Sequence, residues 1–397
     1  MDKIDLKELA KTFKTAREVQ DFVKEITKGM LENILQEELN QHLGYEKHEA
    51  KNSGNSRNGF SSKKLRSTSG EFDLQVPRDR NGLFKPIIVK PYQNDISDFD
   101  QKIISMYARG MTTRDIQAHI EDIYGAEISP AMVSMITDKV MAVAHTWQQR
   151  PLESVYPIVF FDALFFKVRE NGKIISKAAY SCLGIDSNGR KDVLGIWIAQ
   201  TESATHWLQI MNELKSRGVT DIFIACIDGL SGLDKSIEAI FPKTEIQRCV
   251  IHLMRNSFKY IPHKHKVEFI ANLKPVYTAL NEEYAYEALM QLKAKWESRY
   301  PLAIKPWIDN WTQVSTYFKY PEEIRRTIYT TNAVESLHRQ FRKVTKNRSK
   351  LSNDESLYKI LFLAVRNITK NWSHVVRDWP TIAAQLHIMF QERFTVD

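Results

Sequence analysis

Two apolar runs in this chain each carry an aspartate where a carboxylate is costly to bury. Asp162 stands inside the run of residues 157–168, and Asp228 directly follows the run of residues 221–227. Both runs have the length and the bulky apolar composition of buried β-strands. Burying an unpaired carboxylate costs several kcal/mol, so each aspartate needs a partner cation. The pattern predicts a β-rich core that contains charged groups, with a divalent metal as the leading candidate partner.

Further strand-like segments accompany these two runs. We expect three more strands at residues 177–184, 191–199 and 244–248, a turn at residues 186–189 and a helix at residues 206–218. Three meandering strands, then helix, strand, helix and strand, is the order of the ribonuclease-H-like fold, in which the first and fourth strands are parallel neighbours. We therefore predict an α/β protein with a mixed five-stranded sheet that brings Asp162 beside Asp228.

A third acid, Glu335, opens a helix with two distinct faces. At about 100° per residue, three cations fall within about 40° of Glu335. They are Arg339, Arg342 and Lys346, whereas Val334, Leu337, Phe341 and Val344 gather on the far side. Pairing along the helix needs only one cation for Glu335, so two of the three cations remain without an acidic partner on this face. These cations suit the phosphates of DNA, and Glu335 suits a metal ion.

The remaining segments suggest the order of the domains. Helical periodicity over residues 16–35 predicts an amphipathic N-terminal helix. The segment between Asp228 and Glu335 is far longer than one helical connection requires, and its sequence predicts helices. We expect an N-terminal helical region with candidate oligomer contacts at residues 1–50 and a basic flexible arm or linker with a short strand at residues 51–97. A helix-turn-helix domain should follow at residues 98–150. The ribonuclease-H-like catalytic domain should comprise residues 151–249 and 326–397, with an all-α insertion at residues 250–325.

Three helices are expected between residues 98 and 142. Thr112 and Thr113 are both plausible N-caps, and Ser129 precedes Pro130 as an N-cap precedes a proline at the first helical position. This is the layout of a helix-turn-helix with residues 129–139 as the recognition helix. An ordinary three-helix packing unit fits the local sequence equally well, and the basic residues nearby favour DNA.

The positive charge is concentrated in two segments. Residues 51–90 hold five Lys and four Arg against three acids, and residues 336–350 hold six cations and no acid. With a pI of about 9.1, such segments favour a polyanion, and nucleic acid more than a membrane surface. The candidate DNA contacts are Arg57, Lys63, Lys64, Arg66, Arg114, Ser134, Arg339, Arg342, Lys343 and Lys346.

Several classes of protein are disfavoured. The N-terminus lacks the apolar segment of a signal peptide, and no long uncharged apolar stretch occurs, so we expect a cytoplasmic protein, associated with the nucleoid when it binds DNA, and no membrane partner. Three cysteines cannot all pair, and each lies in a strand-like setting, which suits reduced core thiols.

Three carboxylates from separate elements offer oxygen ligands to hard cations. Two such cations can clamp the attacking and leaving oxygens of an in-line phosphoryl displacement, so Mg²⁺ or Mn²⁺ is the expected cofactor and Zn²⁺ is not. Taken singly, each acid has a plainer explanation, because Asp228-Gly229 is a common turn at a strand end and Glu335 could be a surface residue.

In order along the chain, the motifs are Phe-Phe-Asp162-Ala, Ile-Asp228-Gly-Leu-Ser-Gly-Leu, Gln-Arg-Cys249-Val-Ile-His252-Leu-Met-Arg-Asn and Thr-Thr-Asn-Ala-Val-Glu335. Together they resemble those of the bacterial Mutator-type insertion-sequence transposases, a DDE family. The resemblance implies that Asp162, Asp228 and Glu335 are the metal-binding catalytic triad. It also matches Arg342, and Cys249 with His252, to the basic residue and the cysteine-histidine motif of that family.

The same resemblance implies a function and partners. The expected activity is cleavage and transfer of DNA strands at the terminal inverted repeats of a mobile element, with target DNA as second substrate. Because two ends must meet, we expect a homodimer or larger assembly. The alternatives are an inactive helix-turn-helix regulator on a ribonuclease-H-like scaffold and a ribonuclease-H-like nuclease. A tyrosine or serine recombinase would leave the three acids unexplained.

For two tryptophans and one cysteine-histidine pair, a functional role and a structural role are both possible. Trp307 and Trp311 lie one helical turn apart and could stack on an unpaired base, although a place in the core of the insertion is the stronger expectation. Cys249 and His252 could begin a zinc site, but a structural zinc site needs four ligands, so a buried structural pair is favoured.

Overall fold

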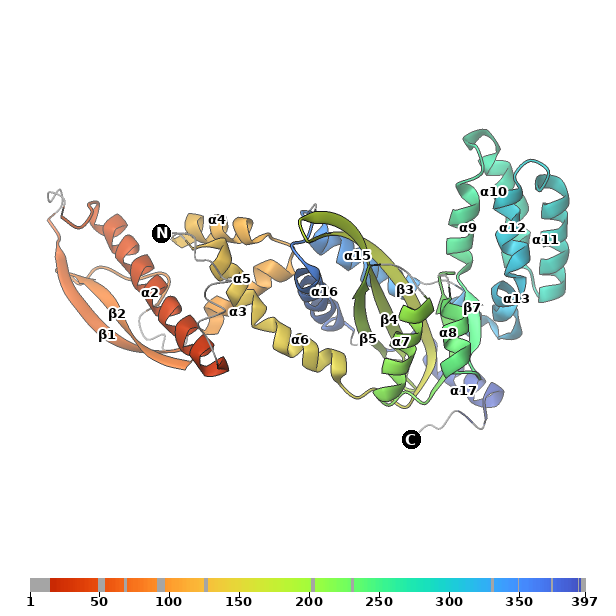
Figure 1. Ribbon diagram of the computed structural model, residues 1–397, viewed down its shortest axis with the longest axis horizontal. Coiled ribbons are helices and arrows are strands. Elements are labelled where there is room, and N and C mark those ends of the chain that lie inside the picture. The colour runs from red at the N-terminus through yellow and green to blue at the C-terminus, as the bar shows by residue number, and fades with distance from the viewer. Residues whose placement is uncertain are drawn as a thin grey trace. The chain divides into compact units, whose positions relative to one another are not determined.

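The computed structural model describes residues 15–48, 54–67, 70–90, 97–124, 128–200, 204–229, 232–329, 332–348, 350–372, 374–391 and 393 (Figure 1). The chain divides into two compact units, Met1–Ala142 and Val143–Asp397, which are described separately. No helix in the described part of the chain has an apolar stretch long enough to span a lipid bilayer. Cys182, Cys226 and Cys249 are buried free thiols, as predicted.

In the first unit, a long helix packs against a two-stranded antiparallel sheet. Helix α2 (Ala16–Leu43) begins at a capping box formed by Thr15 and Glu18. Strands β1 (Arg57–Ser67) and β2 (Gly70–Asp79) pair in antiparallel register. Leu31 and Leu35 of the helix share one apolar cluster with the sheet. The amphipathic helix predicted for residues 16–35 is thus present, and it extends to Leu43.

The prediction of a flexible arm within residues 51–97 is wrong for residues 57–67, which form β1. Leu65 is paired with Phe72 in the register of the sheet, and both side chains are buried beneath α2. The short strand expected in the same segment is part of β2, whose Phe72, Leu74 and Val76 pack in one apolar cluster with Leu65 of β1. The polar residues of β1 satisfy their backbone groups by pairing with β2, which composition alone does not reveal.

Asp79 closes the end of this sheet. Its carboxylate accepts hydrogen bonds from Asn55 Nδ2 at 2.7 Å, from Leu83 N at 3.0 Å and from Phe84 N at 3.1 Å. Burial opposes ionisation, but these hydrogen bonds lower the pKa of Asp79 to about 2. The charged carboxylate therefore stabilises the turn that follows β2.

We predict a pH-dependent loss of stability from Asp79. A carboxyl whose pKa is lowered by folding stabilises the fold above its unfolded pKa of 3.8, and the gain is lost as pH falls toward about 2. Urea unfolding of wild type and Asp79→Asn should therefore differ at pH 5 and converge as pH falls from about 4 to about 2. A difference between the two proteins that stays constant over this range would contradict the assignment.

The helices expected between residues 98 and 142 are present. They are α3 (Ser97–Ala108), α4 (Thr113–Tyr124) and α5 (Pro130–Asp138), followed by α6 (Val140–Gln149). Of the two candidate N-caps, Thr112 caps α4, and it exchanges side-chain hydrogen bonds with Asp115. Ser129 caps α5, with proline at its first position. The division between the two units falls within α6.

The second unit is built on a mixed five-stranded sheet. Its strands are β3 (Val155–Glu170), β4 (Lys173–Ile185), β5 (Lys191–Ala199), β6 (Asp221–Ile227) and β7 (Glu245–Arg248), in the spatial order β5-β4-β3-β6-β7. β3, β4 and β5 are antiparallel neighbours, whereas β6 and β7 are parallel to β3. The predicted succession of strands along the chain and the parallel pairing of the first and fourth strands are confirmed.

Helices cover both faces of this sheet. On one face, α7 (Ala204–Ser216) and α8 (Leu233–Ile240) bury their apolar sides against Phe161, Tyr180 and other sheet residues. On the other face, α15 (Asn332–Thr345) contacts β3 and β4, and α16 (Asp354–Thr369) contacts β5 (Figure 1). The last helix, α17 (Trp379–Met389), joins the core cluster that also contains β6.

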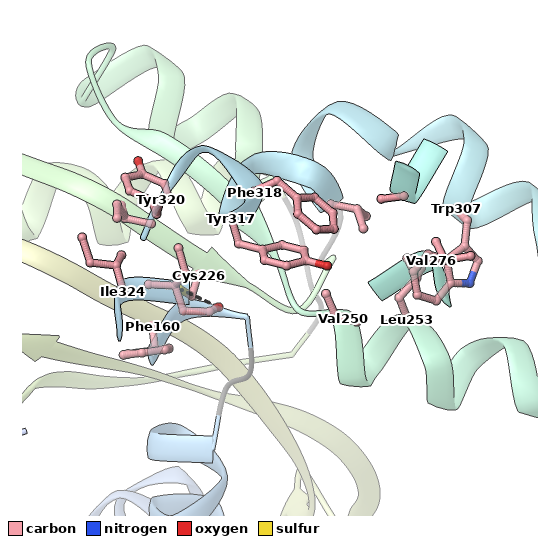
Figure 2. Packing of buried hydrophobic residues seen from close by; sticks show 14 of the residues in the cluster. Phe160, Cys226, Val250, Leu253, Val276, Trp307, Tyr317, Phe318, Tyr320 and Ile324 are labelled. Atoms are coloured by element: carbon pink, nitrogen blue, oxygen red, sulfur yellow. Dashed lines mark hydrogen bonds between the residues drawn. The ribbon is translucent and has the colours of Figure 1, made fainter. Parts of the chain in front are cut away.

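The described residues between β7 and α15 are helical, as expected, and we call this segment the insertion. It comprises α9 (Val250–Phe258), α10 (His263–Thr278), α11 (Glu282–Trp296), α12 (Pro301–Asp309), α13 (Trp311–Val314), the 3₁₀ helix η1 (Ser315–Lys319) and α14 (Glu322–Ile328). Figure 2 shows Cys226 and Phe160 of the sheet close to Tyr317 and Tyr320 of the insertion. The insertion and the sheet therefore share one continuous core.

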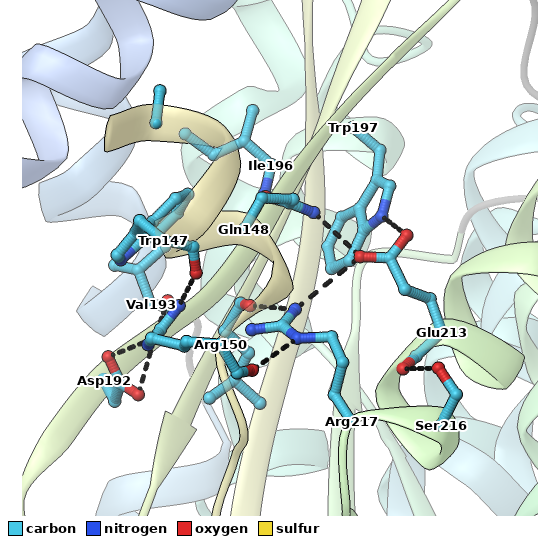
Figure 3. A network of polar contacts seen from close by, with 12 residues as sticks. Trp147, Gln148, Arg150, Asp192, Val193, Ile196, Trp197, Glu213, Ser216 and Arg217 are labelled. Atoms are coloured by element: carbon cyan, nitrogen blue, oxygen red, sulfur yellow. Dashed lines mark hydrogen bonds and ion pairs between the residues drawn. The ribbon is translucent and has the colours of Figure 1, made fainter. Parts of the chain in front are cut away.

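A polar network attaches the end of α6 to the sheet (Figure 3). Gln148 accepts a hydrogen bond from Ile196 N at 3.0 Å and donates one to Glu213 at 3.0 Å. Arg150 pairs with Asp192 at 2.8 Å, and Arg217 donates to the carbonyl of Leu194 at 2.7 Å. These contacts join α6, β5 and α7, which explains why the C-terminal part of α6 belongs to the second unit.

Candidate functional site

Asp162 lies on β3 just beyond the point where β6 stops pairing with it. The last residue pair of the two strands is Phe161 with Ile227, so the next residue of β3 has no partner on that side among the described residues. The Asp162 side chain is only 5% exposed. Its Oδ1 accepts a hydrogen bond from Ala163 N at 2.7 Å, and its Oδ2 lies 3.1 Å from His338 Nδ1. β3 thus holds a buried carboxylate at the end of β6, where the described part of β3 is no longer paired on that side.

Asp228 is the residue that follows the end of β6. Because Ile227 is paired with Phe161, the parallel register places Asp228 and Asp162 at the same end of two adjacent strands. Burial raises the pKa of Asp228. The turn continues through Gly229 at φ +75°, and a β-carbon there would lie 2.8 Å from Arg248 Nη1. The left-handed backbone conformation favours glycine after Asp228, and a side chain there would also displace the end of the Arg248 side chain.

Helix α9 brings His252 onto Asp228. Cys249 N donates a hydrogen bond to the carbonyl of Ile227 at 2.9 Å, which starts α9 directly beside the end of β6. One helical turn later, His252 Nδ1 lies 2.8 Å from Asp228 Oδ1. Burial alone would lower the pKa of His252, but hydrogen bonds with Asp228 and Cys249 raise it. The Cys-x-x-His spacing is therefore explained by one turn of helix that begins at the strand end.

Glu335, in the first turn of α15, lies close to His252. Its Oε1 accepts a hydrogen bond from Arg255 Nη1 and lies 3.8 Å from His252 Nε2. The predicted faces of this helix are confirmed. Val334, Leu337, Phe341 and Val344 are buried, and Arg339, Arg342 and Lys346 are exposed. The packed face of α15 therefore holds Glu335 at the sheet while its cations point to solvent.

The three acids line one pocket of about 370 Å³. The other lining residues are Ala163, Leu164, His252, Arg255, His338, Arg339 and Arg342. The structure therefore brings together the three carboxylates that lie far apart in the sequence, and it surrounds them with imidazole and guanidinium groups. Such a pocket suits a ligand that carries both metal ions and phosphate charge.

The donor atoms of this pocket fit a divalent metal ion. Asp162, Asp228 and His252 each offer one ligand atom, and these atoms all lie within 4.8 Å of one another. Glu335 lies beside His252 and offers a third carboxylate to the same pocket. Carboxylate oxygens suit Mg²⁺ and Mn²⁺, and a single imidazole with carboxylates does not make a structural zinc site.

The other predicted DNA contacts lie in different settings. Arg57 is engaged within the chain, because its guanidinium donates to Asn40 and to the carbonyl of Tyr45. Lys63 donates to the carbonyl of Lys90, and Lys64 pairs with Glu71 at 3.5 Å. Arg66 lies in β1, but its side chain lies outside the described residues. Arg114, Lys343 and Lys346 are exposed, and Ser134 is partly exposed.

The two tryptophans differ in exposure. Trp307 is fully buried, and its Nε1 donates to Ser257 Oγ at 2.9 Å. A base therefore has no free face of Trp307 on which to stack. Trp311 is half-buried and packs against Tyr286, with ring centroids 5.6 Å apart. The expectation that Trp307 belongs to the core is confirmed.

Sequence reasoning missed three residues of the site. His338 is buried between Asp162 and Ser181, whose Oγ lies 2.8 Å from His338 Nε2. Arg255 holds Glu335 from α9. Both could have been found from spacing, because His338 is three residues after Glu335 and Arg255 is three residues after His252, so each pair shares one side of a helix. No local signal marked Ser181, which is set by the register of β3 and β4.

Known proteins resemble this chain over nearly its whole length. The model of the family described as "Transposase, Mutator family" matches residues 2–375. A probable transposase for insertion sequence element ISRM3-like from Sinorhizobium fredii is 42% identical over 371 residues, which cover 93% of this chain and 92% of that protein. The transposase for insertion sequence element ISRM3 from Rhizobium meliloti has the same identity and coverage. The transposase for insertion sequence element IS905 from Lactococcus lactis is 31% identical over 347 residues, 87% of this chain and 88% of that protein.

Proposed function

This chain belongs to the Mutator family of transposases, and we propose on that premise that it binds the terminal inverted repeats of an insertion sequence and catalyses metal-dependent cleavage and transfer of DNA strands. One observation carries the catalytic part of the proposal. Asp162, Asp228 and Glu335 come from two strands and a helix, and all three line one pocket beside three arginines. We assign them as the DDE catalytic triad.

Asp162, Asp228 and Glu335, with His252 beside them, would hold Mg²⁺ or Mn²⁺ in this pocket. When bound, such ions stabilise the negative charge that develops on the attacking and leaving oxygens of an in-line phosphoryl displacement. His338 and Ala163 N contact the two oxygens of Asp162 and so orient that carboxylate. The guanidinium of Arg248 lies next to Gly229, in the turn that follows Asp228, and pairs with Asp234 at 3.4 Å.

The arginines of the pocket would bind the scissile phosphate. Arg255, Arg339 and Arg342 present guanidinium groups, which match the non-bridging oxygens of a phosphodiester. In the first step, a water oxygen bonds to phosphorus as the bond to the 3′ oxygen breaks, which leaves a 3′-hydroxyl and a 5′-phosphate. In the second step, that 3′-hydroxyl bonds to a phosphorus of target DNA and displaces the 3′ oxygen of the target strand.

The remaining parts of the chain would bind and align DNA. The strand order and the mixed sheet support a ribonuclease-H-like catalytic core, interrupted by the insertion of residues 250–325. Helices α3 to α5 would form the helix-turn-helix that binds the repeats, with α5 as recognition helix and Ser134 and Arg114 among its contacts. Two ends must be joined, so a homodimer or larger assembly is the active form.

A cleavage assay tests the proposal directly. The purified chain should nick a labelled duplex that carries one terminal repeat in the presence of Mg²⁺, and it should join the released 3′-hydroxyl end to a supercoiled plasmid. Chelation with EDTA should abolish both products, while binding persists in Ca²⁺. A duplex with a scrambled repeat is the matched control and should be neither bound tightly nor cut at a unique position.

Two other functions predict different results in the same assay. A regulator that only binds DNA would bind the repeat and never cut it, whatever the metal. A nuclease would cut the scrambled duplex as well as the repeat and would produce no joined product. Cleavage at the repeat together with joining is expected only of a transposase, so either alternative result would overturn the proposal.

A further inference from the structure

Helix α9 carries a polar and cationic surface that begins at the catalytic pocket. His252 and Arg255 line the pocket, and Arg255 is 53% exposed. Asn256, Lys259 and Tyr260 are also exposed and continue away from the pocket. At about 100° per residue, Arg255, Asn256 and Lys259 all fall within about 60° of His252. We call Arg255 and Asn256 of α9, together with Lys259 and Tyr260 directly after its last residue, the α9 surface.

The opposite side of α9 is fixed in the core. Val250, Leu253 and Ser257 are buried. Ser257 Oγ donates to the carbonyl of Ala303 at 2.8 Å and accepts a hydrogen bond from Trp307 Nε1 at 2.9 Å. The helix cannot rotate without breaking these contacts, so the α9 surface faces solvent in a defined direction.

The charge of this segment has one sign. Residues 249–267 contain Arg255, Lys259, Lys264 and Lys266 and no acid. Lys259 Nζ donates to Asn256 Oδ1 at 2.8 Å and has no acidic partner among the described contacts of the chain. A solvated helix face usually mixes both signs of charge, whereas a surface of cations with amide and hydroxyl groups suits the phosphates and sugars of nucleic acid.

A second cationic surface begins at the same pocket. Glu335 lies in the first turn of α15, and Arg339, Arg342 and Lys346 continue along that helix. His252 lies in the first turns of α9, so both helices start at the pocket and run away from it. In Figure 1, α15 lies with α16 beside β3 and β4, whereas α9 stands among the helices of the insertion.

We propose that Lys259, with Asn256 and Tyr260 of the α9 surface, binds the phosphate backbone of DNA on one side of the scissile bond, and that Lys346 of α15 binds the backbone on the other side. Arg255, Arg339 and Arg342, which line the pocket between them, are left to the scissile phosphate. The proposal rests on the assignment of the pocket as the cleavage site. A strand that passes through the pocket must leave it on two sides, and residues of both α9 and α15 line the pocket. The function of the insertion is then to supply the second half of the DNA track.

Binding of modified duplexes tests the proposal. Three variants are compared with wild type: Lys259→Gln on α9, Lys346→Gln on α15, and Lys274→Gln, an exposed lysine of α10, as the control. The duplex carries a terminal repeat, and neutral methylphosphonate linkages replace the phosphates on either the element side or the flanking side of the scissile bond. Equilibrium binding is measured in Ca²⁺ over a range of KCl concentrations, and circular dichroism confirms that each variant is folded.

On the unmodified duplex, Lys259→Gln should weaken binding by about threefold to tenfold at low salt and should reduce the salt slope by about 1. This loss should disappear on the duplex neutralised on one side, and the loss from Lys346→Gln should disappear on the duplex neutralised on the other. Binding of Lys259→Gln equal to that of Lys274→Gln, or a loss that disappears on the same duplex as that of Lys346→Gln, would overturn the α9 proposal alone. Equal binding of wild type to repeat and scrambled duplexes would overturn the proposed function.

Discussion

Asp162→Asn is expected to reduce strand cleavage by about a thousandfold or more without loss of binding to the terminal repeat. Removing one carboxylate from a metal site forfeits several kcal/mol of transition-state stabilisation, and each 1.4 kcal/mol corresponds to about a tenfold change in rate. Asparagine keeps the shape of the side chain, so the contact with His338 and the fold of β3 persist. Single-turnover cleavage in Mg²⁺ and binding in Ca²⁺ separate the two effects.

Asp228→Asn and Glu335→Gln should show the same pattern, because all three acids line one pocket. Glu238→Gln, which removes an exposed acid of α8, is the matched control and should cleave like wild type. Cleavage by any triad variant within tenfold of wild type would remove that residue from the catalytic assignment. A loss of cleavage in the control would show that the assay reports net charge instead of the site.

Trp307→Ala is expected to lower the free energy of unfolding of the second unit by about 3–5 kcal/mol. The side chain is fully buried, and its indole N–H bonds to Ser257, which ties α12 to α9. The substitution therefore leaves a cavity and removes a hydrogen bond between two helices of the insertion. Denaturant unfolding followed by far-UV circular dichroism measures the loss.

Trp311→Ala is the matched comparison for this prediction. Trp311 is half-buried, so the same substitution one helical turn away should destabilise the protein much less. Trp307→Phe keeps most of the apolar volume and should lie between the two. If Trp307→Ala left stability unchanged and instead weakened DNA binding, its role in the core would be wrong and the stacking alternative would gain support.

The strands of the five-stranded sheet could be predicted from the sequence because short local patterns determine them. The bounds of β5 and β6 coincide with the predicted residues 191–199 and 221–227, since apolar β-branched runs end at clear turns. The hairpin of β1 and β2 could not be read in the same way. Leu65 finds its apolar partner Phe72 only across the strand pair, and the Asn, Ser and Lys residues of β1 that precede Leu65 carry no strand signal.

The candidate site was predicted in part for a similar reason. Helical phase placed the cations and the packed residues of α15 correctly, because both follow from spacing alone. The contacts of Arg255 with Glu335 and of His338 with Asp162 join residues from different elements. Such contacts depend on how α9 and α15 dock against the sheet, which no single segment encodes.

The position of His338 and Glu335 on one helix has a consequence for how the protein is made. Asp162 on β3 and Asp228 directly after β6 are synthesised well before α15, and the insertion lies between Asp228 and α15. A nascent chain that ends within the insertion therefore lacks both Glu335 and the imidazole that contacts Asp162. The pocket becomes complete only when α15 leaves the ribosome and docks on the sheet, so under the proposed function a truncated or still growing chain would not cut DNA.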